Sequence, residues 1–99
     1  KKLDIRVGTV TGVEKHPDAD KLWLLEVDFG GPTRRLVTGL RGIYEADELQ
    51  GRQIAVLVNL ERTKFGGVES GGMLLAAESG KVVSLLQPDQ QVENGSRIH

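Results

Sequence analysis

Four side chains that could bind a metal ion or transfer a proton lie close together in the segment EKHPDADKL. Glu14, His16, Asp18 and Asp20 occupy every second position, so an extended chain would point all four the same way. Pro17 interrupts this pattern, because its ring fixes its own φ and pushes the preceding residue toward extended geometry. Aspartates are also favoured turn residues, since their carboxylates can bond to nearby backbone N–H groups. A structural turn therefore explains each of these residues.

A metal site in this segment would lack suitable ligands. A transition-metal site usually has a cysteine or a second histidine, whereas this chain has no cysteine and its other histidine is His99. An EF-hand calcium loop would need a central glycine and a later glutamate, which are both missing. We expect no metal and no cofactor, and we expect His16 to be a partly exposed, hydrogen-bonding side chain. A metal enzyme with oxygen ligands remains the alternative.

Other catalytic motifs are also missing from the sequence. Ser70 lies in VESGG, which does not complete the Gly-x-Ser-x-Gly turn of a nucleophilic serine. No lysine follows glycines at the spacing of a phosphate-binding loop. We therefore expect a protein that is not an enzyme.

Composition limits the function classes further. The 99 residues are 38% hydrophobic and 27% charged, which is typical of one globular domain spanning residues 1–99. No apolar run approaches the roughly 20 residues of a membrane span, and no secretory signal is present. The lack of cysteine fits a cytoplasmic protein, and a first residue other than Met suggests a fragment of a longer polypeptide. The net charge of −1 means that any polyanion would need a local basic patch.

Hydrophobic periodicity predicts mostly strands. Alternating or continuous apolar residues indicate strands at 3–13, 23–29, 36–40, 54–58, 73–77 and 82–86, with a hairpin turn at 78–81. The phase slips after Gly8, which predicts a bulge or bend there. A short, weakly capped helix is expected at 44–50, with Gly51 as its C-terminal cap. This order predicts an all-β fold, a five-stranded OB-fold Greek-key barrel with its helix between the third and fourth strands; an SH3-like barrel is the alternative.

The segment after the fourth strand has the most unusual composition. NLERTKFGGVESGGM contains two cations, an amide, two hydroxyls, one aromatic ring and four glycines. Glycines allow a ligand to approach the backbone closely, and Arg62 and Lys64 can bind phosphates. We expect residues 61–72 to form a loop beside the ligand-binding face of the barrel. The same composition also suits a flexible hairpin with solvated charges.

These residues resemble a known family. NLERTKFGGVESGGMLLAA is similar to the hallmark segment of the tRNA-binding domain family, and LDIRVG, HPDADKL and VTGL resemble its other signatures in the same order. The family is an OB-fold module of methionyl-tRNA synthetase C-termini, some tyrosyl enzymes and synthetase cofactors, and free-standing tRNA-binding proteins. The resemblance implies non-catalytic binding of folded tRNA, mainly through its backbone and shape, in or beside an aminoacyl-tRNA synthetase. It also implies a homodimer.

The resemblance assigns RNA contact to particular positions. The matching residues of the hallmark segment are Asn59, Arg62, Lys64, Ser70 and Met73, with core packing as the alternative for Met73. Phe65 is the one ring of the four aromatics that we expect to be free, and Lys21, Arg34 and Arg41 are candidates for widening the basic patch. Glu61 and Gly66 stand where relatives often have Lys or Arg, so this segment is less basic. A protein-interaction or chaperone-like OB domain without a nucleic-acid ligand is the alternative function.

Overall fold

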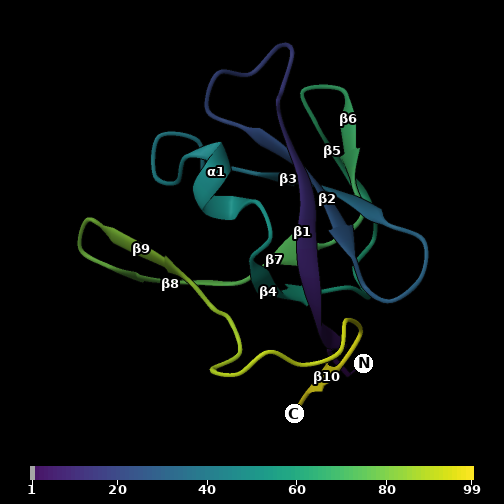
Figure 1. The fold of residues 1–99 in the computed structure, drawn as a ribbon. Coiled ribbons are helices and arrows are strands. Elements are labelled where there is room, and N and C mark those ends of the chain that lie inside the picture. Colours follow the sequence, from purple (N-terminus) through teal and green to yellow (C-terminus); the bar gives the residue numbers. More distant parts are fainter. Residues whose placement is uncertain (1) are drawn as a thin grey trace.

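The fold is built around one long strand, β1 (Ile5–Lys15), in the computed structural model, which describes residues 2–99 (Figure 1). The first half of β1 pairs with β4 (Gln53–Leu57) and its second half with β2 (Trp23–Asp28), both antiparallel. The short β10 (Arg97–Ile98) adds to the start of β1. One strand therefore joins two halves of a strongly bent sheet.

Gly8 and the bulge of β1 are separate features. A Cβ at Gly8 would lie 2.6 Å from Val27 Cγ1 and 2.7 Å from the Phe29 ring, so only glycine fits this close approach. The register of β1 against β2 shifts between Val10 and Gly12, several residues later. The predicted bulge exists, but its placement at Gly8 was wrong. The residue after Gly8, Thr9, is the one at which β1 changes partner from β4 to β2.

The sheet closes into a barrel through its two edges. Its strand order is β3-β2-β1-β4-β7, with β3 at Arg34–Thr38 and β7 at Met73–Leu74. Between these edges, the Gly71 N–H donates to the Arg35 carbonyl at 2.8 Å. The Val37 N–H donates to Ser70 Oγ at 3.0 Å, and that hydroxyl donates to the Gly72 carbonyl at 2.8 Å. The predicted OB-type barrel is confirmed.

The core fills the inside of this barrel. Its buried members are Val10, Trp23, Leu25, Val27, Leu36, Leu40, Leu49, Ile54, Val56 and Leu85. Helix α1 (Ala46–Leu49) contributes Leu49 and lies between β3 and β4 in the chain, as predicted, although it is shorter. Its start is better capped than expected, because the Glu45 N–H donates to Glu48 Oε1 at 2.7 Å. Within residues 2–99, no helix is long and apolar enough to cross a membrane.

Two hairpins extend from the barrel on different sides (Figure 1). The expected hairpin forms from β8 (Ala76–Ser79) and β9 (Val82–Leu85), and residues 73–77 are extended rather than helical. The segment predicted as a loop, with a flexible hairpin as the alternative, forms a second hairpin from β5 (Thr63–Phe65) and β6 (Val68–Ser70). Its two turn residues, Gly66 and Gly67, have φ of 58° and 85°. Two consecutive positive φ angles define the tight turn that suits the twist of a hairpin.

Barrel closure makes Gly72 intolerant of a side chain. A Cβ there would lie 3.0 Å from Val56 Cγ1 and 3.1 Å from the Leu57 carbonyl oxygen. We expect Gly72→Ala to lower the free energy of unfolding by about 1–3 kcal/mol through overpacking. Thermal unfolding should show a fall in Tm of at least several degrees. Gly31→Ala is the control, because a Cβ there meets nothing within 4 Å. Equal Tm values for the two variants would contradict this role for Gly72.

Candidate nucleic-acid interface

His16 ties the β5–β6 hairpin to the turn between β1 and β2. Its Nε2 lies 2.8 Å from the Phe65 carbonyl oxygen, and its Nδ1 lies 3.0 Å from the Asp18 backbone nitrogen. A carbonyl can only accept and a backbone N–H can only donate, so Nε2 carries the proton and Nδ1 accepts. The ring is 3% exposed, so the prediction of a partly exposed side chain was wrong. The side chain is buried because a distant carbonyl completes its hydrogen bonding.

The segment around His16 is a turn. The His16 N–H donates to the Leu22 carbonyl and the Leu22 N–H to the Ala19 carbonyl, each at 3.2 Å. Asp18 and Asp20 are exposed. The side-chain hydrogen bond within the turn is the one that the His16 ring accepts from the Asp18 N–H, and it does not involve an aspartate carboxylate. Across residues 2–99, no three His, Asp or Glu side chains come together in a way that could hold a metal ion.

Gly66 allows the hairpin to approach the histidine ring. A Cβ at this position would lie 2.7 Å from His16 Cε1, and its φ of 58° is one that side chains disfavour. A lysine or arginine at Gly66 would therefore have to displace the ring.

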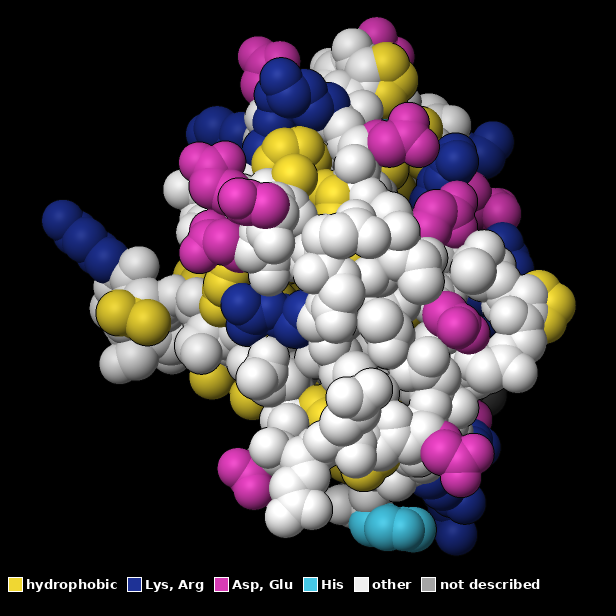
Figure 2. Space-filling view, in the orientation of Figure 1, with side chains coloured by type: hydrophobic (Ala, Val, Ile, Leu, Met, Phe, Trp, Pro, Cys, Tyr) yellow, Lys and Arg dark blue, Asp and Glu magenta, His cyan; other side chains and the backbone are white. Residues whose placement is uncertain are grey.

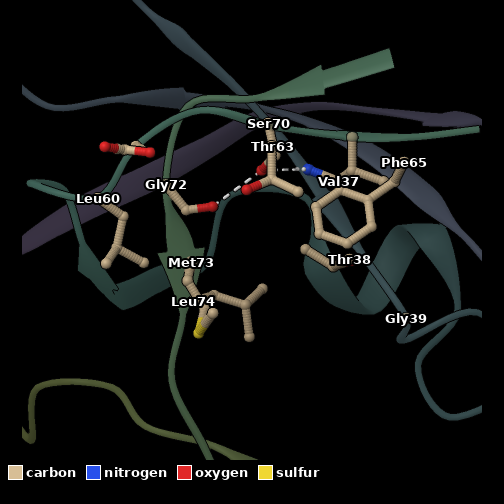
Figure 3. A pocket seen from close by; sticks show the side chains of 11 residues that line it. Val37, Thr38, Gly39, Leu60, Thr63, Phe65, Ser70, Gly72, Met73 and Leu74 are labelled. Carbon is tan, nitrogen blue, oxygen red and sulfur yellow. Dashed lines mark hydrogen bonds between the residues drawn. The ribbon is translucent and has the colours of Figure 1, made fainter. Parts of the chain in front are cut away.

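The hairpin encloses a cavity against β3 and β7 (Figure 3). The cavity has a volume of about 260 Å³. Its walls include Val37, Thr38, Leu60, Phe65, Met73 and Leu74. Three of these side chains are half-exposed at the mouth: Phe65 at 41%, Leu60 at 42% and Met73 at 53%. Met73 is therefore not a core residue.

The two cations of the hairpin lie on its other face. Thr63 and Phe65 line the cavity, so Arg62 and Lys64, which alternate with them, point away from it. Arg62 Nη1 lies 3.2 Å from Glu69 Oε1, and Glu69 is also the cross-strand partner of Lys64. Part of the positive charge is therefore neutralised locally. Acidic and basic side chains are likewise interleaved over the face in Figure 2.

Three of the predicted contact residues use their polar groups inside the protein. Asn59 accepts from the Asp4 N–H at 2.9 Å and donates to the Lys2 carbonyl at 2.7 Å. Arg34 Nη1 donates to the carbonyls of Val58 and Gly71, at 3.0 and 3.2 Å. The third is Ser70, which is 4% exposed and joins the two edges of the barrel.

The remaining two candidates lie near the ends of β2 and β3. Lys21 is exposed in the turn that precedes β2. The Arg41 guanidinium lies 5.2 Å from the centroid of the Trp23 ring, within the range of a cation–π contact. Sequence reasoning missed Thr38, which lines the cavity. A polar residue in the inward phase of a strand, two positions after the buried Leu36, is the signal that could have identified it.

Because His16 positions the hairpin, its removal should loosen the site. We expect His16→Ala to lower the free energy of unfolding by about 1–3 kcal/mol, since a buried carbonyl and a backbone N–H lose their partner. Amide hydrogen exchange should accelerate in residues 63–70 more than in the β1–β2 pair. Asp18→Ala removes an exposed side chain and should change stability by less than about 0.5 kcal/mol. Unchanged protection of the hairpin in His16→Ala would show that the ring does not hold it.

Known proteins are similar to this chain in sequence and in fold. The methionine–tRNA ligase of Thermococcus onnurineus is 50% identical over 97 residues, which are 98% of this chain but 13% of the relative. The crystal structure of a MetRS related protein from Pyrococcus horikoshii superposes with a TM-score of 0.91 at 39% identity, covering 98% of this chain and 90% of the other. The CsaA chaperone protein from Picrophilus torridus has a TM-score of 0.90 at 31% identity, covering 99% and 92%.

A family model matches almost the whole chain, whereas the ligases are matched over only part of their length. The chain spans about 13% of the length of the methionine–tRNA ligases that it matches, so the match concerns one part of those proteins. A model of the family described as "Putative tRNA binding domain" matches residues 5–97, from the start of β1 into β10. The chain therefore belongs to the tRNA-binding domain family.

Proposed function

We propose that this chain is a non-catalytic module that binds folded tRNA with the β5–β6 hairpin and the adjoining cavity. The observation that carries the proposal is the His16–Phe65 contact, because it joins the β1–β2 turn to the hairpin. In OB folds, the corresponding loops flank the surface on which oligonucleotides bind. The hairpin presents cations on one face and an exposed aromatic ring on the other. These are the two kinds of group that RNA binding uses.

The nine predicted residues take two roles in this proposal. Six are placed to contact RNA: Arg62, Lys64, Phe65, Met73, Lys21 and Arg41. Asn59, Ser70 and Arg34 act indirectly, because their hydrogen bonds hold the ends of the strands that carry the hairpin. Since Glu69 neutralises part of the hairpin's charge, we infer that affinity depends on shape as well as on phosphate contacts.

The wider setting of the module is part of the same proposal. We place the chain, as a single domain over residues 1–99, in or beside a methionyl-tRNA synthetase in the cytoplasm, where it raises tRNA affinity. Its 50% identity to part of a methionine–tRNA ligase supports this placement. A homodimer is also proposed. Its interface is the apolar hollow lined by Ile5, Leu75 and Leu86, which shares no residue with the hairpin cavity.

A second candidate function is binding of an extended polypeptide. The mouth of the cavity exposes apolar side chains, and a protein with the same fold is called a CsaA chaperone protein. The two functions differ in their dependence on charge. A peptide held by apolar contacts should be insensitive to salt, whereas tRNA binding should weaken as salt rises.

The cations of the hairpin provide the main test of tRNA binding. We expect the double variant Arg62→Ala/Lys64→Ala to bind every tRNA more weakly by a similar factor, because phosphate contacts carry no sequence information. The slope of log K against log salt should become shallower by about 1.5 units, which corresponds to two lost phosphate contacts. Filter binding over a salt series measures both quantities.

The control must remove the same charge elsewhere. Lys81→Ala/Arg97→Ala removes one exposed cation from the β8–β9 turn and one from β10. Both elements lie away from the β5–β6 hairpin in Figure 1. This variant should keep most of the salt slope. Equal loss of slope in the two double variants would mean that net charge, not the hairpin, determines binding.

Shape recognition predicts a preference for folded RNA. Binding of unstructured strands usually requires several exposed rings for base stacking. Of the four aromatic residues, Trp23 is buried, Phe29 and Tyr44 are partly covered, and Phe65 is exposed. We expect folded tRNA to bind more tightly than unstructured RNA of equal length at the same salt concentration, in competition gel shifts. Equal or tighter binding of the unstructured strand would contradict recognition of shape.

A further inference from the structure

Thr38 is a buried hydroxyl without a hydrogen bond. The side chain is 7% exposed and lines the hairpin cavity. Its Oγ1 is the one buried side-chain polar atom in residues 2–99 that has no partner. An unsatisfied buried hydroxyl costs free energy, and the great majority of buried polar groups are bonded. The Thr38 side chain therefore has an unused hydrogen-bonding group beside the cavity.

The rest of the cavity has the properties of a site for one flat ring. Its volume of about 260 Å³ is near the lower limit of ligand pockets, which begin at about 300 Å³. In Figure 3 the Phe65 ring lies beside Thr38 and Thr63, with Met73 and Leu74 across the opening. A planar group that enters this space would stack against the phenyl ring and contact the thioether.

Glu61 determines which kind of ring fits. It lines the same cavity and is exposed, so its carboxylate can accept hydrogen bonds from a bound group but repels phosphate. The guanine edge carries the complementary pattern. Its N1–H and N2–H₂ groups can donate side by side to a carboxylate, and its O6 can accept from a threonine hydroxyl. RNA loops present such unstacked bases, and proteins bind them by stacking and edge hydrogen bonds.

We propose that the hairpin cavity takes one unstacked guanine of the bound RNA, stacked on Phe65, with Glu61 accepting from its N1 and N2 and Thr38 donating to its O6. This inference rests on the proposed tRNA binding and adds to it the base that enters the site. The outer face of the hairpin holds phosphates, while the inner face reads one base. Substitutions on the outer face should therefore change the salt dependence of RNA binding, and substitutions on the inner face should change base recognition.

Chemical protection of guanine tests the proposal in the intact complex. Folded tRNA is treated, with and without saturating protein, with a 1,2-dicarbonyl reagent that attacks N1 and N2 of unpaired guanine. The wild-type chain should protect one unpaired guanine. Phe65→Leu and Glu61→Gln should each lose this protection and bind about tenfold more weakly with the salt slope unchanged. Lys64→Ala should show the reverse, with a shallower slope and the protection kept at saturation.

Glu61→Gln separates base recognition from general electrostatics. Removing a negative charge near a polyanion should strengthen binding if the charge only repels, whereas loss of a guanine acceptor should weaken it. Thr38→Val keeps the shape of the side chain and removes the unpaired hydroxyl. It should weaken tRNA binding while the Tm of the free protein stays equal or rises. A lower Tm would show that the hydroxyl already has a partner, which would overturn its assigned role.

Other outcomes would overturn the inference in distinguishable ways. If tRNA binds and no guanine is protected, or if Glu61→Gln binds more tightly, the base does not enter and the proposed function stands alone. If Phe65→Leu leaves tRNA binding unchanged but abolishes binding of an extended apolar peptide, the occupant is a polypeptide side chain. The absence of saturable tRNA binding would overturn the proposed function itself, and this inference with it.

Discussion

The interface depends on the closure of the barrel between β3 and the segment 70–72. The Ser70 hydroxyl accepts from the Val37 N–H of β3 and donates to the Gly72 carbonyl, and the Gly71 N–H donates directly to the Arg35 carbonyl. A Cβ at Gly72 would lie 3.0 Å from Val56 Cγ1 and 3.1 Å from Leu36 Cδ2, so both side chains would have to shift. Because β5 and β6 lead directly into this closure, it places the hairpin over the end of β3.

The alternation of side chains along β5 divides the hallmark segment into two surfaces. Within β5, Thr63 and Phe65 face the cavity, while Lys64 faces outward above Glu69. A segment read along the sequence as one basic, glycine-rich patch is therefore two sites of different chemistry. The outward surface is the one proposed to contact phosphate, and the Arg62–Glu69 ion pair reduces its free positive charge. The inward surface is mostly apolar and includes Glu61, so it is the one proposed to take a base.

Alternating and continuous apolar runs were sufficient to predict the main barrel strands, because these strands bury one face or, as in β4, both faces. This signal failed for β5 and β6, whose residues are nearly all exposed and so carry no apolar period. The pair Gly66-Gly67 was a readable hairpin signal. The burial of His16 was not readable, since its partner carbonyl lies 49 residues away in the sequence. The internal bonds of Asn59 and Ser70 were hidden for the same reason, because a side chain's type does not reveal where the fold places its partners.

The four segments that resemble the family contribute to one structural unit, the barrel with its β5–β6 hairpin. Gly8 lets β1 pass close to Val27, and so brings both halves of the sheet together. His16 then holds the hairpin, the VTGL segment supplies Thr38 to the cavity, and the hallmark segment closes the barrel. Each segment therefore helps to position the others. A substitution in the β1–β2 turn can alter the interface as much as one in the hairpin, because the hairpin is positioned from that turn.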